Sequence, residues 1–459
     1  STQTPIYDGT TDSWSVSSYN VIDTNSDGEI QVTEAQAIKW LDVSGGSYIN
    51  NIEGIEAFSN LQVLICEYIE LPTLDASSLT NLIFLNCNFN QLTNLNVEGL
   101  VNLKKLWCVS NQLNSLNVSG LTNLTNLDFA LNQITNIDVS SLTNLSILSC
   151  YDNQLTSLDV TNSSSLFDLY CYNNQLSSLN ISGLTNLQGL GCYNNQLSSL
   201  NASGLTNLAV LSCENNQLTN LDILGLNNLQ TLDCSSNQLT ILDVSDLINL
   251  RTLNCNNNQL INLNTKNGNA DGFYEIGIYD NLNLQYICSN EIDIANVQQM
   301  IDLYGYINCH VNNYCSFTPN GTFYEISGNI KLDSNSNGCD VSDINYPNIN
   351  FSITDGTNTG SLIANQTGNY YLPVSAGNHT ITPNLESPSY FNISPINFTV
   401  NFPAQTTPFT QDFCVTANGI KHDVEVVLIP TVPARPGFDA NYKLVYRNKG
   451  NQVENGTIS

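Results

Sequence analysis

One pattern governs the middle of this chain, where a cysteine recurs every 21 residues. The cysteines stand at positions 66, 87, 108, 150, 171, 192, 213, 234 and 255, and Phe129 fills the one vacant position of the series. Leu103 to Asn123 shows the whole unit, L-K-K-L-W-C-V-S-N-Q-L-N-S-L-N-V-S-G-L-T-N. A unit of this size cannot bury its own apolar face, so it is stable only when neighbours stack into one continuous core. The period therefore predicts a solenoid.

The template L-x-x-L-x-C-x-x-N-x-L-x-x-L-x-V-x-x-L-x-N is that of a leucine-rich repeat with cysteine in place of one leucine. Within a unit, Leu106 and Cys108 alternate with Trp107 and Val109, which is the period of a short strand with one buried side. We expect these strands to pair in parallel on the concave face, about 4.8 Å apart. The rest of the unit is too short for a full helix, so extended chain or a short 3₁₀ turn should follow.

An asparagine holds the turn after each strand. The series comprises Asn90, Asn111, Asn132, Asn153, Asn174, Asn195, Asn216, Asn237 and Asn258. A buried amide at this point can bond the backbone of adjacent coils and satisfy groups that the turn would leave unpaired. We interpret the series as structural.

The repeated cysteines favour a structural role over metal binding. Zinc sites need convergent Cys or His, typically in C-x₂-C pairs, and the sequence contains no such pair. Stacked strand cysteines would also hold their Cβ atoms farther apart than the roughly 3.8 Å that a disulfide prefers. We predict free thiols that act as small core hydrophobes.

A twelve-residue calcium loop precedes the repeats, with every position filled by the expected residue type. The side chains of Asp23, Asn25 and Asp27, the carbonyl of Glu29, the water-bridging side chain of Gln31 and the bidentate Glu34 would supply the oxygens. The alternative is an acidic turn that matches by chance. A helix should follow from Val32 to Leu41, so the loop lies in an N-terminal cap, where Ca²⁺ would act as a structural clip or, alternatively, as a switch.

The pattern decays after Asn264. Ile292 to Leu303 has helical spacing, which indicates a C-terminal cap closing near Cys315. From about Phe317, short alternating runs separated by Gly, Pro and Asn are typical of a β-sandwich. Beyond Ala417 two further strands are expected, on either side of a turn-rich stretch at 430–436. Two strands cannot form an independent sandwich, so we expect the natural chain to continue past residue 459.

These patterns divide the chain into five parts. They are an N-terminal cap with an EF-hand-like calcium loop (1–60), ten 21-residue repeats (61–266), a C-terminal cap (267–316), a β-sandwich (317–415) and the start of an Ig-like β domain (416–459).

A second run of oxygen ligands opens the sandwich. It comprises Asp333, Asn335, Asn337, the carbonyl of Cys339, and Asp343. The run is one residue shorter than the full loop and lacks its terminal Glu. It predicts a second calcium site, with an Asx-rich turn as the alternative. Of the cysteines outside the repeats, we expect Cys339 to pair with Cys414 and Cys288 with Cys315.

The formal net charge of −29 argues against nucleic acid or an anionic membrane as a partner. No segment approaches 18 consecutive apolar residues, so no transmembrane segment is expected. The chain starts at Ser1 without a signal peptide, as a processed, exported protein would. The histidines at 310, 379 and 422 are scattered, and no nucleophile elbow or phosphate-binding loop accompanies them. We expect no enzymatic activity.

Aromatic residues mark the concave face of the middle repeats. Tyr151, Tyr172 and Tyr193 fall in one column, Tyr170 and Trp107 in the neighbouring one, and Asp128, Asp152 and Asp168 lie close by. A rigid file of aromatics suits stacking on sugar rings or on a partner protein's side chains. The alternative is a ladder that serves stability through cross-strand stacking. In the later repeats the column carries Glu214, Ser235 and Asn256, which confines the predicted patch to the middle coils.

The order of these motifs resembles that of large secreted leucine-rich repeat proteins of Bacteroidetes, particularly Flavobacterium-like ones. The resemblance rests on the calcium loop, the L-x-x-L-x-C-x-x-N-Q-L repeat, V-N-N-Y-C-S-F-T-P-N-G-T-F-Y at 311–324, D-x-N-x-N-G-C-D at 333–340 and P-A-R-P-G-F at 433–438. It implies export by the type IX secretion system through the outer-membrane machinery, and a sandwich like the calcium-binding B-type repeats of surface adhesins.

The expected function is that of a calcium-stabilised binding or adhesion protein at an outer cell surface, with a protein or glycan ligand on the concave face. The alternative is a structural spacer or targeting arm of a larger secreted protein whose activity lies beyond residue 459.

Overall fold

The computed structural model describes residues 2–3, 5–8, 13–16, 21–45, 49–307, 309–315, 323–430 and 442–454. Its internal contacts divide the chain into two units. The first contains residues 1–261 and 267–283, and the second contains residues 262–266 and 284–459.

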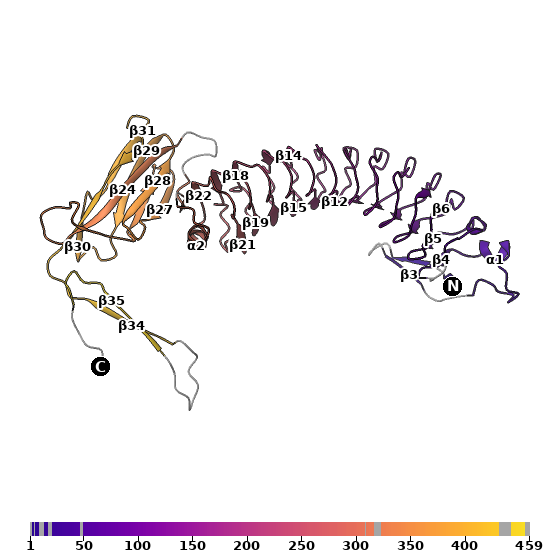
Figure 1. Ribbon diagram of the computed structural model, residues 1–459, viewed down its shortest axis with the longest axis horizontal. Helices are drawn as coiled ribbons and strands as arrows, with labels where there is room; N and C mark the ends of the chain where they lie inside the picture. Colours follow the sequence, from indigo (N-terminus) through magenta and orange to yellow (C-terminus); the bar gives the residue numbers. More distant parts are fainter. Residues whose placement is uncertain are drawn as a thin grey trace, which may run out of the picture. The chain divides into compact units, whose positions relative to one another are not determined.

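The first unit is a solenoid whose coils stack one beside the next (Figure 1). One strand from each coil joins a 13-stranded sheet. In spatial order its strands are β1 (Thr2–Gln3), β4 (Trp40–Asp42), β5 (Val63–Ile65), β7 (Phe84–Asn86), β9 (Lys105–Trp107), β10 (Asn126–Asp128), β11 (Ile147–Ser149), β12 (Asp168–Tyr170), β13 (Gly189–Gly191), β15 (Val210–Ser212), β17 (Thr231–Asp233), β19 (Thr252–Asn254) and β21 (Glu275–Gly277). All pairs except β1–β4 are parallel, as the repeat predicts.

The pairing is in register, so equivalent side chains of successive coils form columns. Leu106 pairs with Leu127 and Leu127 with Leu148, and all three are fully buried. The leucine columns are the stacked core that a single unit could not provide. The side of the sheet that faces away from this core is called the concave face below.

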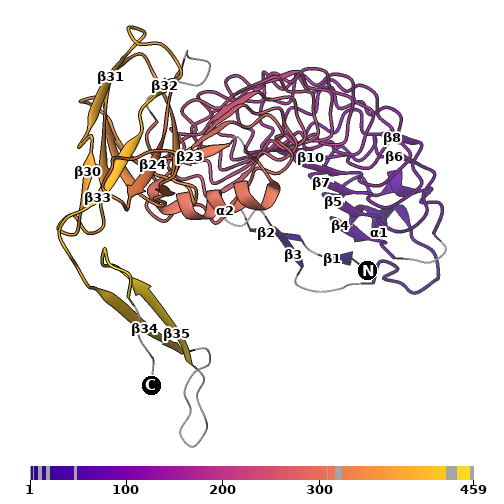
Figure 2. The ribbon, with the colours of Figure 1, turned by 60° about the vertical axis from the view of Figure 1, so that its left-hand side comes forward.

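The opposite side of each coil carries turns and very short strands, as expected from the repeat length. These strands are β6 (Thr73–Asp75), β8 (Asn94–Asn96), β14 (Ser199–Asn201), β16 (Asn220–Asp222) and β18 (Ile241–Asp243). Figure 2 shows β6 and β8 across the coils from β5 and β7. In the turns, the N–H of Leu124 donates to the carbonyl of Leu121 at 2.9 Å, the i to i+3 bond of a 3₁₀-type turn.

The asparagine series does what the sequence predicts. The amide nitrogen of Asn132 donates to the carbonyls of Cys108, Phe129 and Ala130 at 2.9 to 3.1 Å, and its oxygen accepts from Leu113 N–H at 3.0 Å. The same set of bonds recurs at Asn111, Asn153, Asn174, Asn195, Asn216, Asn237 and Asn258. One side chain thus serves two coils, and the bonds replace those that a regular strand would provide.

The predicted helix from Val32 to Leu41 is wrong in its second half. The helix α1 covers only Val32–Gln36, and Trp40 begins β4. The reason is tertiary, because β4 pairs with β5 and Trp40 packs against Val63 and Phe84. The sheet therefore starts one coil before Leu61. A 3₁₀ helix, η1 (Ile55–Ala57), fills the connection between β4 and β5.

The second unit begins with three parallel strands, β20 (Asn262–Asn264), β22 (Tyr286–Cys288) and β23 (His310–Asn312). The 3₁₀ helix η2 (Glu291–Asp293) and helix α2 (Ile294–Tyr304) connect β22 to β23, close to the predicted helical segment. Tyr314, just after β23, is fully buried in the core of the sheets that follow.

Two sheets follow, and one hydrophobic core contains residues from both. One has β24 (Tyr324–Asp333), β25 (Ile344–Asn345), β28 (Asn369–Val374), β30 (Phe391–Ser394), β32 (Phe409–Thr410) and β33 (Phe413–Ala417). The other has β26 (Asn350–Thr354), β27 (Thr359–Ile363), β29 (Gly377–Asn384) and β31 (Phe398–Phe402).

Two antiparallel hairpins complete the described strands, β2 (Pro5–Asp8) with β3 (Ser13–Val16), and β34 (Val424–Pro430) with β35 (Tyr442–Asn448). The turn-rich stretch at 431–436 and the predicted sandwich start at Phe317 lie outside the described residues. Among the described residues, no helix is both long and apolar enough to cross a membrane.

Candidate functional site

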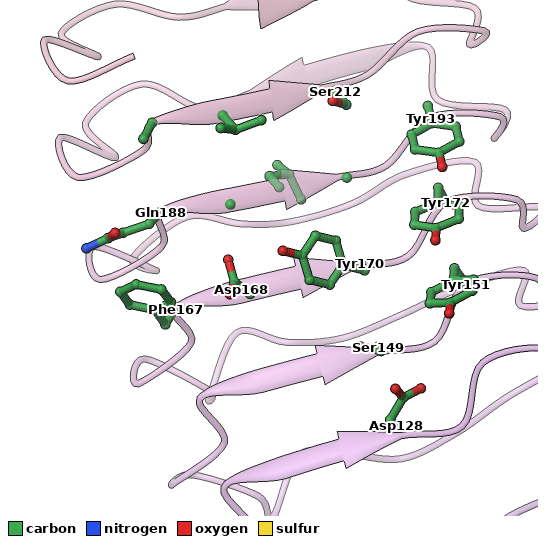
Figure 3. A pocket seen from close by; sticks show the side chains of 15 residues that line it. Asp128, Ser149, Tyr151, Phe167, Asp168, Tyr170, Tyr172, Gln188, Tyr193 and Ser212 are labelled. Atoms are coloured by element: carbon green, nitrogen blue, oxygen red, sulfur yellow. The ribbon is translucent and has the colours of Figure 1, made fainter. Parts of the chain in front are cut away.

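The three tyrosines of the middle coils stack face to face. Tyr151, Tyr172 and Tyr193 each lie two residues beyond the end of a sheet strand, at the same place in successive coils (Figure 3). The ring centroids of Tyr151 and Tyr172 are 4.4 Å apart with planes 11° apart, and those of Tyr172 and Tyr193 are 4.2 Å apart with planes 8° apart. We call these residues the tyrosine column.

This stacking limits how a ligand can use the column. Both faces of Tyr172 are covered by its neighbours, so a ligand can reach only its ring edge and hydroxyl group. Tyr151 and Tyr193 each have one ring face that no other tyrosine of the column covers. A ligand stacked on every ring, as the sequence suggested, is therefore excluded, and the rings stack on one another instead. Burial raises the pKa of all three phenols.

Beside the column, two glycines make room for the side chains of the preceding coil. Asp168 pairs with Gly189 and Tyr170 with Gly191 in the sheet. A Cβ at Gly191 would lie 3.4 Å from the rings of both Tyr170 and Tyr172, and one at Gly189 would collide with the Asp168 carboxylate. The absence of side chains at these two glycines thus leaves the space that the Tyr170 ring and the Asp168 carboxylate occupy.

The result is a hollow of about 660 Å³ on the concave face. The tyrosine column, Tyr170, Asp168 and Asp128 line it, together with the two glycines. Its walls combine aromatic rings with carboxylates, the mixture of apolar surface and few polar groups that small ligand sites and peptide grooves share.

Two predicted residues lie outside this hollow. Trp107 is three coils from Tyr170 in the same column, and its ring packs edge-on against Phe84 with centroids 4.8 Å apart. It belongs to the apolar cluster of the N-terminal coils and not to the tyrosine site. Asp152 lies on the turn, where its Oδ1 accepts from the amide of Asn173 at 2.8 Å.

A carboxylate stands at each end of the tyrosine column. Asp128 pairs in the sheet with Ser149, two residues before Tyr151. Glu214 follows Tyr193 one coil on, where its carbonyl accepts from Asn194 N–H at 3.0 Å. Burial raises the pKa of Asp128 to about 6 and that of Glu214 to about 7. Glu214 does not line the hollow, but it continues the column of the three tyrosines by one coil, a position that the sequence analysis placed outside the predicted patch.

In the N-terminal loop, side-chain oxygens of the predicted calcium ligands accept hydrogen bonds from backbone N–H groups of the same loop. The two oxygens of Asp23 accept from the N–H groups of Asp27 and Gly28, and the amide oxygen of Asn25 also accepts from Asp27 N–H. Gly28 has a φ of +91°, which only glycine adopts readily. Glu34 closes the loop by accepting from the backbone of Thr24 at 2.7 Å and of Gln31 at 3.1 Å. Glu29 contributes only its carbonyl to the predicted ligand set.

The second loop repeats this geometry in an unrelated part of the chain. Asp333 accepts from the N–H groups of Asn337 and Gly338, Asn335 accepts from Asn337 N–H, and Gly338 has a φ of +92°. Asp343 takes the closing role by accepting from Asp340 N–H at 2.9 Å. The side chain of Cys339 is in a disulfide, so only its carbonyl is free to act as a ligand.

The donor sets of both loops fit Ca²⁺, which prefers carboxylate, amide and carbonyl oxygens. In the part of the chain that the structure describes, no three His, Cys, Asp or Glu side chains converge as a metal site would require. The amide and carbonyl oxygens on which these loops depend are not among those residue types.

The cysteines follow the expected arrangement. Disulfides join Cys288 to Cys315 and Cys339 to Cys414, while the ladder cysteines and Cys309 are free and buried. Burial raises the pKa of the Cys66 thiol to about 12, so this ladder member is un-ionised at neutral pH.

Two of the three histidines serve the packing of the second unit. His310 stacks on Tyr371 with centroids 4.3 Å apart. His379 is fully buried, and its Nδ1 lies 2.8 Å from the hydroxyl of Tyr314. Burial lowers the pKa of both imidazoles.

Comparisons with known proteins agree with the fold. The family model for leucine-rich repeats (two copies) matches residues 206–247. The functional domain of InlJ from Listeria monocytogenes, whose structure includes a cysteine ladder, is 26% identical with a TM-score of 0.52, and the match covers 84% of this chain and 92% of that one.

Two further solved structures match at lower similarity. They are the internalin InlF from Listeria monocytogenes (21% identity, TM-score 0.49, covering 59% of this chain and 86% of that one) and a leucine-rich repeat protein of Leptospira interrogans (22%, 0.38, 61% and 97%). A comparison with curated proteins gave no match. The chain contains a leucine-rich repeat solenoid with a parallel sheet and little helix.

Proposed function

We propose that this chain is a secreted or cell-surface binding protein that recognises a partner on the concave face of its solenoid. The observation that carries the proposal is the hollow of about 660 Å³, which is lined by the tyrosine column, by Tyr170 and by the carboxylates of Asp128 and Asp168. Rigid aromatic side chains with polar tips are the residues on which binding energy concentrates at protein interfaces. The similarity to the InlJ functional domain, which carries the same kind of cysteine ladder, supports a surface role.

A protein partner fits this site better than a glycan. Sugar rings bind aromatic side chains face-on, and the stack leaves only the outer faces of Tyr151 and Tyr193 open. Ring edges, hydroxyls and carboxylates instead suit the side chains and backbone of a polypeptide.

We further propose that Ca²⁺ occupies the loops at 23–34 and 333–343 and that each acts as a structural clip. The shared geometry of the two loops supports this proposal. The sandwich would then resemble the B-type repeats of surface adhesins. From the order of the motifs we also propose an origin in Bacteroidetes and export by the type IX system. The competing function is that of a structural spacer or targeting arm.

A display selection tests the proposal. A library of peptides is selected on the full chain, a glycan array is probed in parallel, and each binder is measured on the triple variant Tyr151→Ala, Tyr172→Ala, Tyr193→Ala. Each lost aromatic contact is worth about 0.5 to 1.5 kcal/mol, so binding should weaken roughly tenfold or more.

The matched control is the double variant Tyr68→Ala, Phe89→Ala. It removes another aromatic stack of the solenoid, with centroids 4.5 Å apart, and should leave binding intact. If the selected binders have the same affinity for the triple variant as for the unmodified chain, the spacer function is favoured.

A further inference from the structure

The middle of the solenoid is uniformly acidic. Between Lys105 and Arg251 the chain contains aspartate and glutamate but no lysine, arginine or histidine. Four of these carboxylates stand on strands or directly after strands of the concave sheet, namely Asp128, Asp168, Glu214 and Asp233. Arg251, at the far end, is held by Asp271 at 3.0 Å. The basic groups that these carboxylates lack must therefore come from outside this segment.

The two carboxylates at the ends of the tyrosine column have few hydrogen-bond partners. Oε2 of Glu214 is shielded from solvent and has no hydrogen-bond partner. Asp128 accepts one bond, from Ala130 N–H at 3.2 Å. By contrast, Asp233 accepts from Ser235 and from the amide of Asn254 at 2.9 Å. A partly buried carboxylate without a counter-charge is unfavourable until a cation joins it.

Each of these carboxylates lies near an end ring of the column. Tyr193 stacks on Tyr172 with one ring face, and the charge of Glu214 acts on its phenol. Tyr151 stacks on Tyr172 with one ring face, and the charge of Asp128 acts on its phenol. An aromatic face beside a carboxylate is a favourable place for a guanidinium or ammonium group, because cation–π and charge attraction add.

The distance between the two ends fixes the spacing of such cations. Four strand-to-strand steps lead from β10 through β11, β12 and β13 to β15, which is about 19 Å at about 4.8 Å a step. An extended peptide rises about 3.3 Å per residue, so about six residues cover this length. Residues six apart in an extended chain also point to the same side.

We propose that the ligand is an extended segment of a partner protein with two lysine or arginine residues about six positions apart, one bound by Asp128 and the other by Glu214, while the intervening residues contact the tyrosine edges and hydroxyls. This inference rests on the proposed function and names the chemistry of its partner.

The test uses the full chain and synthetic twelve-residue peptides that carry a fluorophore. The first peptide has arginine at positions 3 and 9 in a neutral Ser/Thr/Val background. Its controls have citrulline at both positions, glutamate at both positions, or arginine at 3 and 6. Binding is measured by fluorescence anisotropy at low and at 0.5 M salt.

The 3/9 arginine peptide should bind at least tenfold more tightly than every control, and high salt should weaken it. Asp128→Asn and Glu214→Gln keep the side-chain shape and should each weaken it about tenfold, while Asp246→Asn, on the outer side of the coils, should not. A glutamate or citrulline peptide of equal affinity would overturn the inference, as would unchanged binding to both variants.

Different results would contradict the proposed binding function and the proposed basic ligand. If neutral peptides or glycans bind and lose affinity in the triple tyrosine variant, the binding function stands and the basic ligand is wrong. If no peptide and no glycan binds the full chain, both are contradicted.

Discussion

Glu214 occupies the position in its coil that Tyr193 occupies in the coil before, so the column continues with an acidic residue in place of a fourth tyrosine. The file of aromatics therefore ends on a partly buried acid. Burial disfavours the charged form of the Glu214 carboxylate. Protonation of Glu214 should therefore stabilise the folded protein even when no ligand is bound.

The first prediction concerns pH. The folded-state pKa values of Glu214, about 7, and Asp128, about 6, are raised above those of an unfolded chain. The folded protein thus holds protons that the unfolded chain has lost, so their contribution to stability is present at low pH and declines between about pH 4 and 7. We expect the melting temperature to fall from pH 5 to 7.5, and Glu214→Gln to reduce that fall. An equal fall in wild type and variant would contradict the assignment.

The asparagine series should be essential for stability. Asn174→Ala removes an acceptor from Leu155 N–H at 2.9 Å and a donor from the carbonyls of Cys150 and Cys171, all in the buried turn. Each unsatisfied buried group costs about 1 to 3 kcal/mol. Urea unfolding should therefore show a loss of at least about 2 kcal/mol. Asn186→Ala, which breaks one exposed bond to Ser164, is the control and should lose less than about 1 kcal/mol.

Calcium should support the N-terminal cap. Without the ion, the carboxylates of one short loop repel each other, so a chelator should lower the melting temperature of the wild type. In Asp23→Ala with Glu34→Gln the chelator should have a smaller effect, whereas Asp138→Asn, a turn residue of the solenoid, should respond like wild type. If the chelator leaves the melting temperature of the wild type unchanged, the loops are acidic turns and not calcium sites.

The ladder cysteines should be unreactive in the native protein. They are fully buried, and for the Cys66 thiol burial raises the pKa to about 12, so both access and ionisation are suppressed. Native labelling with a maleimide should modify none of them, and labelling in denaturant without reductant should modify the ten free thiols. A lower count after denaturation would indicate a disulfide within the ladder.

The sequence predicted the solenoid well because its information is periodic. Leucine, cysteine and asparagine recur at fixed spacing, and each position has one physical task that the structure confirms at Leu106, Cys108 and Asn132. The N-terminal strand was missed because its local sequence permits a helix, and only the contact of Trp40 with Val63 and Phe84 decides for a strand.

The candidate site was predicted less completely. Register alone placed Tyr151, Tyr172 and Tyr193 together, but column spacing could not show that the rings cover one another. The sequence also grouped Trp107 with Tyr170, since both share a column, although three coils separate them. Depth of burial, which distinguishes Glu214 and Asp128 from exposed acids, depends on neighbouring coils and was not visible in the pattern.

The most direct test of the central claim is to map where a selected binder lies. Oxidative footprinting with mass spectrometry, performed on the full chain with and without a peptide from the display selection, reports the protection of each tyrosine. The account predicts that Tyr151, Tyr172, Tyr193 and Tyr170 become protected, whereas Tyr68 and Tyr274, exposed elsewhere on the solenoid, do not. Protection of Tyr68 or Tyr274 with the tyrosine column unchanged would contradict it.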